Sequence, residues 1–208
     1  MNTAIIGIVG KRGVGKDTTA QAIIIATNLL KKTGEIPTPQ QVSEHLTKGQ
    51  SAGDKLYWDF TLIAFADKIK AICSEMYGLH LGYFNDRTLK EKVIPGLGKS
   101  PRELLCHTGD ILKTHFGGDV FVKDVMKGLS LDKKYIFTDV RYISEVTAII
   151  DRAGVLIKVI RPGTGDGKHS SETEQDRIAT HYVIDNNGSF EHLSKQVIEI
   201  LTKINILK

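Results

Sequence analysis

A set of glycines and one lysine near the beginning of the chain has the spacing of a phosphate-binding loop. Residues 10–16 read Gly-Lys-Arg-Gly-Val-Gly-Lys, the G-x-x-x-x-G-K pattern. Glycines allow consecutive backbone N–H groups to turn toward one anion, and the helix that follows adds the positive end of its dipole. Lys16 supplies a mobile positive charge for the outer phosphates. The pattern therefore predicts that a nucleoside triphosphate binds here.

The residue after this lysine departs from the usual pattern. Ser or Thr normally stands there, and its hydroxyl helps to hold Mg²⁺, whereas this chain has Asp17 followed by Thr18 and Thr19. Asp17 could reach the metal through water or cap the helix start, and either threonine could take over a phosphate or metal contact. The alternative for the whole segment is a glycine-rich turn without a ligand. The residues expected at the phosphates are Gly10, Lys11, Arg12, Gly13, Val14, Gly15, Lys16, Asp17 and Thr18.

Strands and helices alternate along the rest of the chain. Apolar runs predict strands at 4–9, 61–65, 135–138, 155–160 and 182–184. This alternation predicts an α/β fold in which a mostly parallel sheet is covered by helices on both faces. The helices are expected at about 17–32, 68–77, from 101 onward, 119–129, 143–153 and 190–201.

Three polar segments interrupt this pattern. Residues 34–60 are expected to form a surface insertion of uncertain order, with a short helix at 40–48. Residues 83–99 are expected to form a loop that could cover a site, and residues 163–180 a lid-like loop.

Charged side chains recur where the predicted strands end. Asp67 follows the second strand, Asp139 and Arg141 follow the third, and Arg161 follows the fourth. Ligands of parallel α/β sheets bind at the carboxyl ends of the strands. Each charge alone could be an ordinary solvated residue, and Asp139 could cap the next helix. Their recurrence at one edge predicts a shared site.

The composition favours a cytoplasmic globular protein. The chain has 208 residues, of which 41% are hydrophobic, and a formal net charge of +4, which is weak support for a nucleic-acid partner. Two cysteines, Cys73 and Cys106, form no disulfide or zinc framework. The sequence shows neither an apolar run that spans a membrane nor the features of a signal peptide. We therefore expect no membrane and no nucleic-acid partner.

The chain resembles the deoxynucleoside monophosphate kinases of tailed bacteriophages, within the wider group of nucleoside monophosphate kinases. Apart from the loop motif, the ordered set of blocks carries the resemblance rather than any single block. The matching blocks are Gly15–Ala20, Phe65–Lys70, Arg102–Asp110, Thr138–Arg141 with Glu145, Val159–Gly163, His169–Glu172 and Asp185–Ser189.

The resemblance implies a P-loop kinase fold of three α/β/α layers in a single domain over residues 1–208, with an acceptor-binding region at about 67–130. It implies transfer of the γ-phosphoryl group of ATP, as its Mg²⁺ complex, to a deoxynucleoside 5′-monophosphate (dNMP). It also suggests a homodimer, and the cytoplasm of the host cell if the gene is a phage gene.

The resemblance further assigns individual residues. Together with the chemistry of phosphoryl transfer, it marks Lys16, Arg102, Arg141 and Asp139 as the candidate catalytic residues, while Asp17 is the candidate metal contact, through water, from its place after Lys16. Arginine suits such roles because its planar fork binds phosphate oxygens in pairs. The implied dNMP-binding residues are Ile69, Lys70, Arg87, Arg102, Gly109, Phe121, Asp139, Arg141 and Glu145.

Other interpretations stay open at this point. Arg102 could face solvent near a helix start, and Glu145 could pair with a basic residue on its own helix. The enzyme could be another small-molecule P-loop kinase, resembling dephospho-coenzyme A or phosphomevalonate kinases. A nucleic-acid-linked P-loop ATPase is a further alternative, although the strand at 135–138 does not end in the paired acids that this class predicts.

Overall fold

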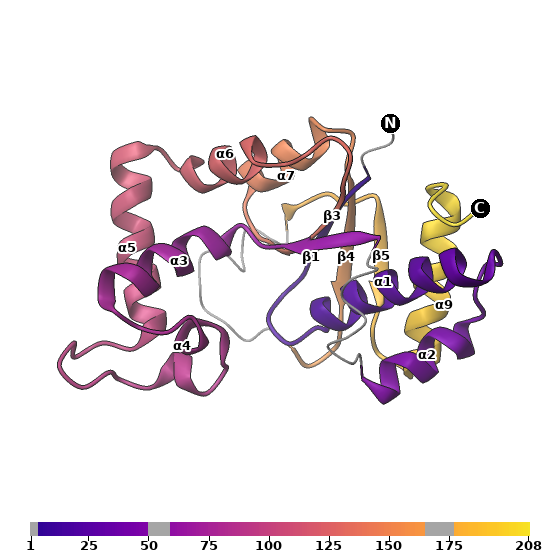
Figure 1. Ribbon diagram of the computed structural model, residues 1–208, viewed down its shortest axis with the longest axis horizontal. Coiled ribbons are helices and arrows are strands. Elements are labelled where there is room, and N and C mark those ends of the chain that lie inside the picture. Colours follow the sequence, from indigo (N-terminus) through magenta and orange to yellow (C-terminus); the bar gives the residue numbers. More distant parts are fainter. Residues whose placement is uncertain (1–3, 50–58, 165–176) are drawn as a thin grey trace. The chain divides into compact units, whose positions relative to one another are not determined.

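A computed structural model describes residues 4–49, 59–164 and 177–208 (Figure 1). The chain forms two compact units, one made of Met1–Ala64 with Ser130–Lys208, and one made of Phe65–Leu129. We call them the sheet unit and the helical unit. None of the helices in the described ranges is long and apolar enough to cross a membrane.

Five strands form the centre of the sheet unit. They are β1 (Ile5–Val9), β2 (Phe60–Ile63), β3 (Lys134–Val140), β4 (Val155–Ile160) and β5 (Tyr182–Asp185). Their order across the sheet is β2-β3-β1-β4-β5, and each neighbouring pair is parallel. The strands predicted from apolar runs are thereby confirmed, with shifts of one or two residues at some ends.

Helices cover both faces of this sheet (Figure 1). Ile6 and Ile8 of β1 point into the main core, which they share with α1 (Lys16–Thr33), α2 (Pro39–Lys48) and α9 (Phe190–Lys203). Gly7 faces the opposite side, where an added Cβ would lie 2.7 Å from Cδ1 of Ile149 in α7 (Ile143–Ile150). The strand alternation thus places one helical layer on each face, and the expected α/β/α fold is confirmed.

The segment expected to be a surface insertion contributes a packed helix. A capping box between Thr38 and Gln41 and a proline at the first helical position begin α2. Val42 of this helix is fully buried in the main core, and Leu46 packs against it. Residues 50–58 of the same segment lie outside the described residues.

A carboxylate joins three elements of the sheet unit at the amino ends of its strands. Asp59 lies 2.6 Å from the Lys31 ammonium of α1 and 2.7 Å from that of Lys134 in β3, and its side chain is 11% exposed. Burial by itself raises the pKa of Asp59, but the hydrogen bonds and charges of Lys134 and Lys31 lower it below its ordinary value. This contact holds the end of α1 beside the first residues of β2 and β3.

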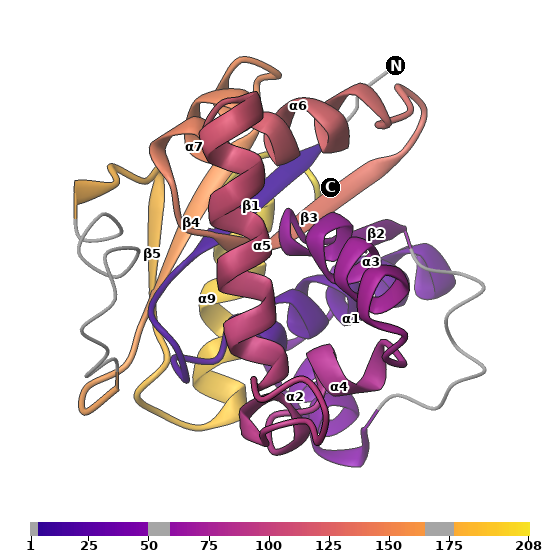
Figure 2. The same cartoon turned by 90° about the vertical axis from the view of Figure 1, so that its left-hand side faces the viewer.

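The helical unit has its own small core. Its helices are α3 (Ala66–Tyr77), α4 (Gly82–Asn85), α5 (Pro101–Phe116) and α6 (Val120–Lys127), with a 3₁₀ turn, η2 (Leu89–Glu91). Ile69, Cys73 and Phe84 form the buried cluster. α3 and α5 pack side by side (Figure 2), and the Tyr77 hydroxyl lies 3.0 Å from the Thr108 hydroxyl between them.

The segment 83–99 is more ordered than the loop predicted for it. It contains most of α4, the turn η2 and an antiparallel bridge between Ile94 and Lys99. Asp86 starts η2, because its Oδ1 accepts the backbone N–H groups of Thr88 and Leu89, each at 2.8 Å. Short turns of this kind carry no hydrophobic periodicity, so the sequence pattern did not reveal them.

Candidate phosphate-binding site

The loop between β1 and α1 passes too close to its neighbours for side chains at its first and last motif glycines. Gly15 has a φ of 97°, and a Cβ there would collide with Nδ2 of Asn186. At Gly10 a Cβ would lie 2.6 Å from the carbonyl oxygen of Val159 in β4. Glycine is therefore required at Gly10 by the close approach of the β4 backbone, and at Gly15 by backbone conformation, since the Asn186 amide is the movable end of a side chain.

Lys16 lies over the beginning of this loop. Its half-buried side chain donates hydrogen bonds from Nζ to the carbonyl oxygens of Gly10, at 2.7 Å, and Lys11, at 3.0 Å. An ammonium group has three N–H donors and is a mobile point charge. The lysine therefore holds a positive charge beside the loop amides, on contacts that an incoming phosphate oxygen can replace.

The first turn of α1 distinguishes the three candidate oxygen donors. Asp17 is exposed and Thr18 is half-buried, but Thr19 is fully buried and its hydroxyl donates to the Gly15 carbonyl at 3.0 Å. The full burial of the Thr19 side chain argues against the hypothesis that it takes over a metal contact. Asp17, with a carboxylate in the first turn of the helix, and Thr18 stay as candidates.

Strand register brings the loop beside the end of β3. Val9 and Val140 are partners across the parallel pair β1–β3. Gly10 and Arg141 therefore leave neighbouring strands at the same edge of the sheet. Arg141 is exposed there, so two of the sequence-predicted elements of the site lie next to each other.

Asp139 lies inside a strand rather than after one. The strand was expected to end at Thr138, but β3 continues to Val140. Asp139 is half-buried in its penultimate position. A polar residue near the end of a buried strand looks like a loop residue in sequence, which explains the error. The hypothesis that Asp139 caps the next helix is also wrong, because the cap residue of α7 is Tyr142.

Glu145 fixes the backbone that carries Arg141. Its Oε2 accepts the backbone N–H groups of Arg141, at 2.7 Å, and of Tyr142, at 3.1 Å. Only 7% of Glu145 is exposed. It closes the amino end of α7 and thereby sets the direction in which the chain leaves β3, a contact to the main chain that the sequence did not predict.

Asn186 supports the loop from the other side. It follows β5 directly, its backbone N–H donates to the Ile160 carbonyl at 2.9 Å, and its Nδ2 donates to the Val14 carbonyl at 2.8 Å. The residue lies in the block Asp185–Ser189 of the resemblance, but its contact with the loop was not predicted. The contact spans 172 positions of sequence, so no local pattern signals it.

The candidate acceptor residues of the helical unit occupy different environments. Ile69 is 8% exposed and belongs to the core of that unit, and Phe121 packs against the same core. Lys70 donates from Nζ to Asp67 at 2.9 Å on the same helix. Arg87 is exposed in the turn between α4 and η2. The burial of Ile69 makes it a core residue of the helical unit first of all.

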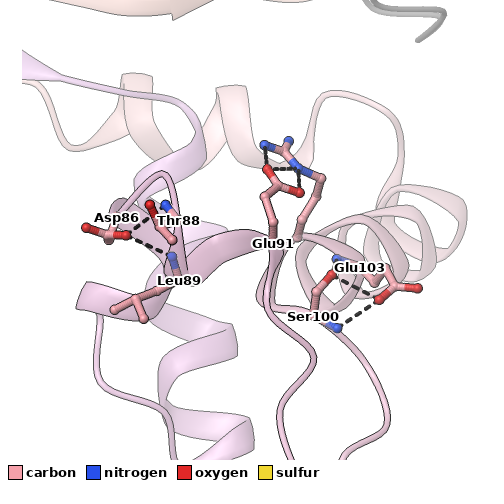
Figure 3. A network of polar contacts seen from close by, with 7 residues as sticks. Asp86, Thr88, Leu89, Glu91, Ser100 and Glu103 are labelled. Carbon is pink, nitrogen blue, oxygen red and sulfur yellow. Dashed lines mark hydrogen bonds and ion pairs between the residues drawn. The ribbon is translucent and has the colours of Figure 1, made fainter.

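Arg102 forms an ion pair with the carboxylate of Glu91 and does not simply face solvent. Its Nε lies 2.8 and 2.9 Å from the two carboxylate oxygens of Glu91, and its Nη2 lies 2.6 Å from Oε1 (Figure 3). This hydrogen-bonded pairing raises the pKa of the Arg102 guanidinium. Arg102 is thus a permanent cation that Glu91 holds in a fixed place.

Gly109 leaves a space in the middle of α5. The residue is buried, yet a Cβ added to it would meet no heavy atom within 4 Å. Glycine is unfavourable inside a helix, and here neither packing nor backbone conformation requires it. Gly109 therefore stays a candidate for contact with a ligand.

Residues 165–176, which include the block His169–Glu172 and most of the lid-like segment 163–180, lie outside the described residues.

Among the described residues, no three His, Cys, Asp or Glu side chains come together as a metal site.

Comparison with known proteins gives a relative along nearly the whole chain. No protein-family model matches. A curated protein of Acanthamoeba polyphaga mimivirus, named "Putative deoxynucleotide monophosphate kinase", is 26% identical over 222 residues, covering 93% of this chain and 94% of the relative. This chain is its distant homologue. The resemblance inferred from the sequence is confirmed at that level.

Among solved structures, shikimate kinase from Aquifex aeolicus matches with a TM-score of 0.44 and 11% identity, over 97% of this chain and 98% of the other. The strand order β2-β3-β1-β4-β5 with a phosphate-binding loop after β1 is typical of P-loop nucleoside monophosphate kinases.

Proposed function

We propose that the protein is a deoxynucleoside monophosphate kinase, which transfers the γ-phosphoryl group of ATP to a dNMP and yields the diphosphate and ADP. The observation that carries the proposal is the distant homology across 93% of this chain to a protein named for that activity. The loop after β1 is suited to the donor phosphates, which makes a phosphoryl-transfer reaction chemically consistent with that name.

The donor half of the reaction uses positioning and charge. The transferred group passes through a loose transition state that spreads negative charge over its oxygens. The ammonium of Lys16 exchanges the carbonyl oxygens of Gly10 and Lys11 for oxygens of the β- and γ-phosphates. We expect the loop amides to complete a cradle for these phosphates, as in other loops with this glycine spacing.

The residues in the first turn of α1 fit a magnesium ion that arrives with ATP. Mg²⁺ prefers oxygen ligands and keeps several of its waters. The exposed Asp17 carboxylate, acting through water, and the Thr18 hydroxyl are the donors that we assign to it. When bound, the ion neutralises charge on the phosphates.

The acceptor half needs cations but no separate base. An oxygen of the 5′-phosphate of the dNMP is already anionic; it forms a bond to the γ-phosphorus as the bond to the β–γ bridging oxygen breaks, and ADP keeps that electron pair. We assign Arg102, Arg141, Lys70 and Arg87 to the acceptor phosphate and the transferring group.

The other residues of the acceptor half are assigned roles other than a charge contact with the phosphates. Asp139 orients Arg141 or accepts a sugar hydroxyl, and Glu145 fixes the Arg141 backbone. Gly109 permits close approach of the nucleotide to α5, and Ile69 and Phe121 border it from the core of the helical unit.

The test is a coupled assay of ADP release with a panel of acceptors. The panel contains the dNMPs, dephospho-coenzyme A, phosphomevalonate, single-stranded DNA and no acceptor. We expect turnover with at least one dNMP, and we expect Lys16→Ala to lower it by roughly 10²–10³-fold, as for loss of one preorganised donor at the transferring group. Lys32→Ala, at the exposed end of the same helix, is the matched control and should leave the rate unchanged.

Other outcomes decide among the alternatives. Turnover with dephospho-coenzyme A or phosphomevalonate in place of every dNMP would assign the enzyme to another kinase group. ATP hydrolysis that needs DNA and no acceptor would favour a nucleic-acid-linked ATPase. Equal rates for wild type and Lys16→Ala would remove this lysine from the mechanism.

A further inference from the structure

Glu91 and Arg102 are brought together by a short folded segment of the helical unit. Asp86 starts η2 by accepting two backbone N–H groups, and the bridge between Ile94 and Lys99 then reverses the chain. Because of this reversal, Glu91 at the end of η2 meets Arg102 in the first turn of α5, although the two are 11 positions apart.

The base of this segment is fixed from the α5 side as well. Ser100 and Glu103 form a capping box, in which Glu103 Oε2 accepts the Ser100 backbone N–H at 2.8 Å and its hydroxyl at 2.9 Å (Figure 3). The backbone of Arg102 lies between these two residues. Both partners of the ion pair are therefore mounted on backbone that local hydrogen bonds hold in place.

The pair engages one edge of the guanidinium and leaves the other edge unused. An arginine side chain has five N–H donors. Glu91 takes the Nε donor and one donor of Nη2, so three donors, on Nη1 and Nη2, make no hydrogen bond to any residue of the described ranges. Two of the three, one on each of these nitrogens, form the end-on edge that binds phosphate oxygens in pairs.

We propose that Glu91 is a positioning residue: its carboxylate fixes the Nε edge of Arg102 so that the Nη1–Nη2 edge is presented, already oriented, to the phosphate of the acceptor. The proposal rests on the proposed function for the identity of that anion. A flexible arginine must lose rotational freedom when it binds phosphate, and a preorganised one has lost it beforehand. Glu91 therefore strengthens acceptor binding without touching the acceptor.

The opposite role for Glu91 would be to weaken binding of the acceptor phosphate to Arg102. A carboxylate beside Arg102 could compete with the phosphate for the guanidinium, or weaken the attraction by its own negative charge. The three unused donors favour positioning, because the phosphate does not have to displace Glu91 to reach them. The two roles predict opposite changes in acceptor affinity when the carboxylate is removed.

The test compares wild type with Glu91→Gln, Glu91→Ala, Arg102→Gln and the double variant Glu91→Gln/Arg102→Gln. We expect Glu91→Gln and Glu91→Ala to raise the KM for the dNMP by about three- to tenfold, as for loss of one preorganised side chain, with the KM for ATP unchanged. In the Arg102→Gln background the same change at Glu91 should have no further effect. Glu75→Gln, which removes an exposed carboxylate from α3 of the same unit, is the matched control and should behave as wild type.

Calorimetric titration of the dNMPs and of inorganic phosphate, without ATP, gives a readout that does not depend on turnover. Turnover of a dNMP by wild type, together with unchanged or improved acceptor affinity in both Glu91 variants, would overturn the positioning role and leave the proposed function intact. Absence of turnover, together with phosphate binding that weakens in Glu91→Gln, would overturn the proposed function and leave the positioning role. A wild-type protein that neither binds nor turns over these compounds contradicts both.

Discussion

Asp17 and Thr19 stand two positions apart in α1, yet their side chains have opposite environments. Asp17 is exposed, whereas Thr19 is fully buried and donates its hydroxyl to the Gly15 carbonyl. Full burial keeps the Thr19 hydroxyl away from an ion bound outside the helix, whereas the Asp17 carboxylate reaches solvent. The unusual acidic residue after Lys16, rather than the threonines beyond it, is thus the better candidate for the outer sphere of Mg²⁺.

Asp17→Asn should raise the Mg²⁺ concentration that gives half-maximal activity by about three- to tenfold, because a water-mediated contact loses its charge. Thr19→Val should leave this concentration unchanged and lower the free energy of unfolding by about 1 kcal/mol, through loss of a buried hydrogen bond. Magnesium titrations of activity and urea unfolding measure the two effects. A shift of the magnesium dependence in Thr19→Val alone would contradict the assignment.

At the scale of single residues, sequence patterns predict what is local. The glycine spacing and Lys16 could be recognised because a phosphate-binding loop motif consists of consecutive residues. Asn186 was not found as a support of this loop, since its partner Val14 lies 172 positions away. Glu91 was missed as the partner of Arg102, because a 3₁₀ turn carries no periodicity that would place its side chains.

The helix α5 contains a glycine that its fold does not require. Gly109→Ala should raise the free energy of unfolding by about 0.5–1 kcal/mol, because alanine is the better helix former and a Cβ here would meet no atom within 4 Å. If the acceptor approaches this position, the same change raises the KM for the dNMP. Urea unfolding and steady-state kinetics measure the two effects.

Asp110→Ala is the control for this variant, because Asp110 is the exposed neighbour of Gly109 on the same helix. It should change the KM for the dNMP little. A stabilised Gly109→Ala enzyme with wild-type KM would remove Gly109 from the acceptor site.

The contact among α1, β2 and β3 makes stability depend on pH. Asp59→Asn should lower the free energy of unfolding at pH 7 by about 1–2 kcal/mol, a value reduced for the exposure of Lys31. Because Lys134 and Lys31 lower the pKa of Asp59 below 3.8 in the folded protein, its contribution is present above that value and is lost as the pH falls through the folded pKa.

Urea unfolding of wild type and Asp59→Asn at several pH values measures this contribution. The difference between the two proteins should stay constant from pH 7 to about pH 5 and shrink below about pH 3.8. A difference that grows in acid would mean that another group is responsible.

Element boundaries were predictable where the sequence carries stop and start signals. Ser100, Pro101 and Glu103 predicted the beginning of α5, and the structure shows that capping box. The end of β3 was placed too early because Asp139 looks like a loop residue. The packing of α2 was missed because one buried residue, Val42, in a polar segment gives too little periodicity to predict a core helix.

At the scale of the whole molecule, the residues assigned to the two substrates are distributed over both compact units. The phosphate-binding loop, Asp139 and Arg141 belong to the sheet unit, whereas Lys70 and Arg102 belong to the helical unit. Neither unit by itself contains all the cations that the proposed transfer requires. This division predicts that the donor nucleotide and the acceptor nucleotide slow amide hydrogen exchange in different parts of the chain.

Hydrogen exchange with each nucleotide alone tests this division. ADP should slow exchange of amides in the loop and in α1, because their N–H groups bind its phosphates, and it should leave residues 65–129 near their free rates. A dNMP should slow exchange in α3 and α5, and also beside Arg141 in the sheet unit. The matching deoxynucleoside, which lacks the phosphate, should give little protection near Arg102, since the guanidinium has no anion to bind. Protection by a dNMP that is confined to the sheet unit would mean that the helical unit does not bind the acceptor, and Arg102 and Gly109 would then need another explanation.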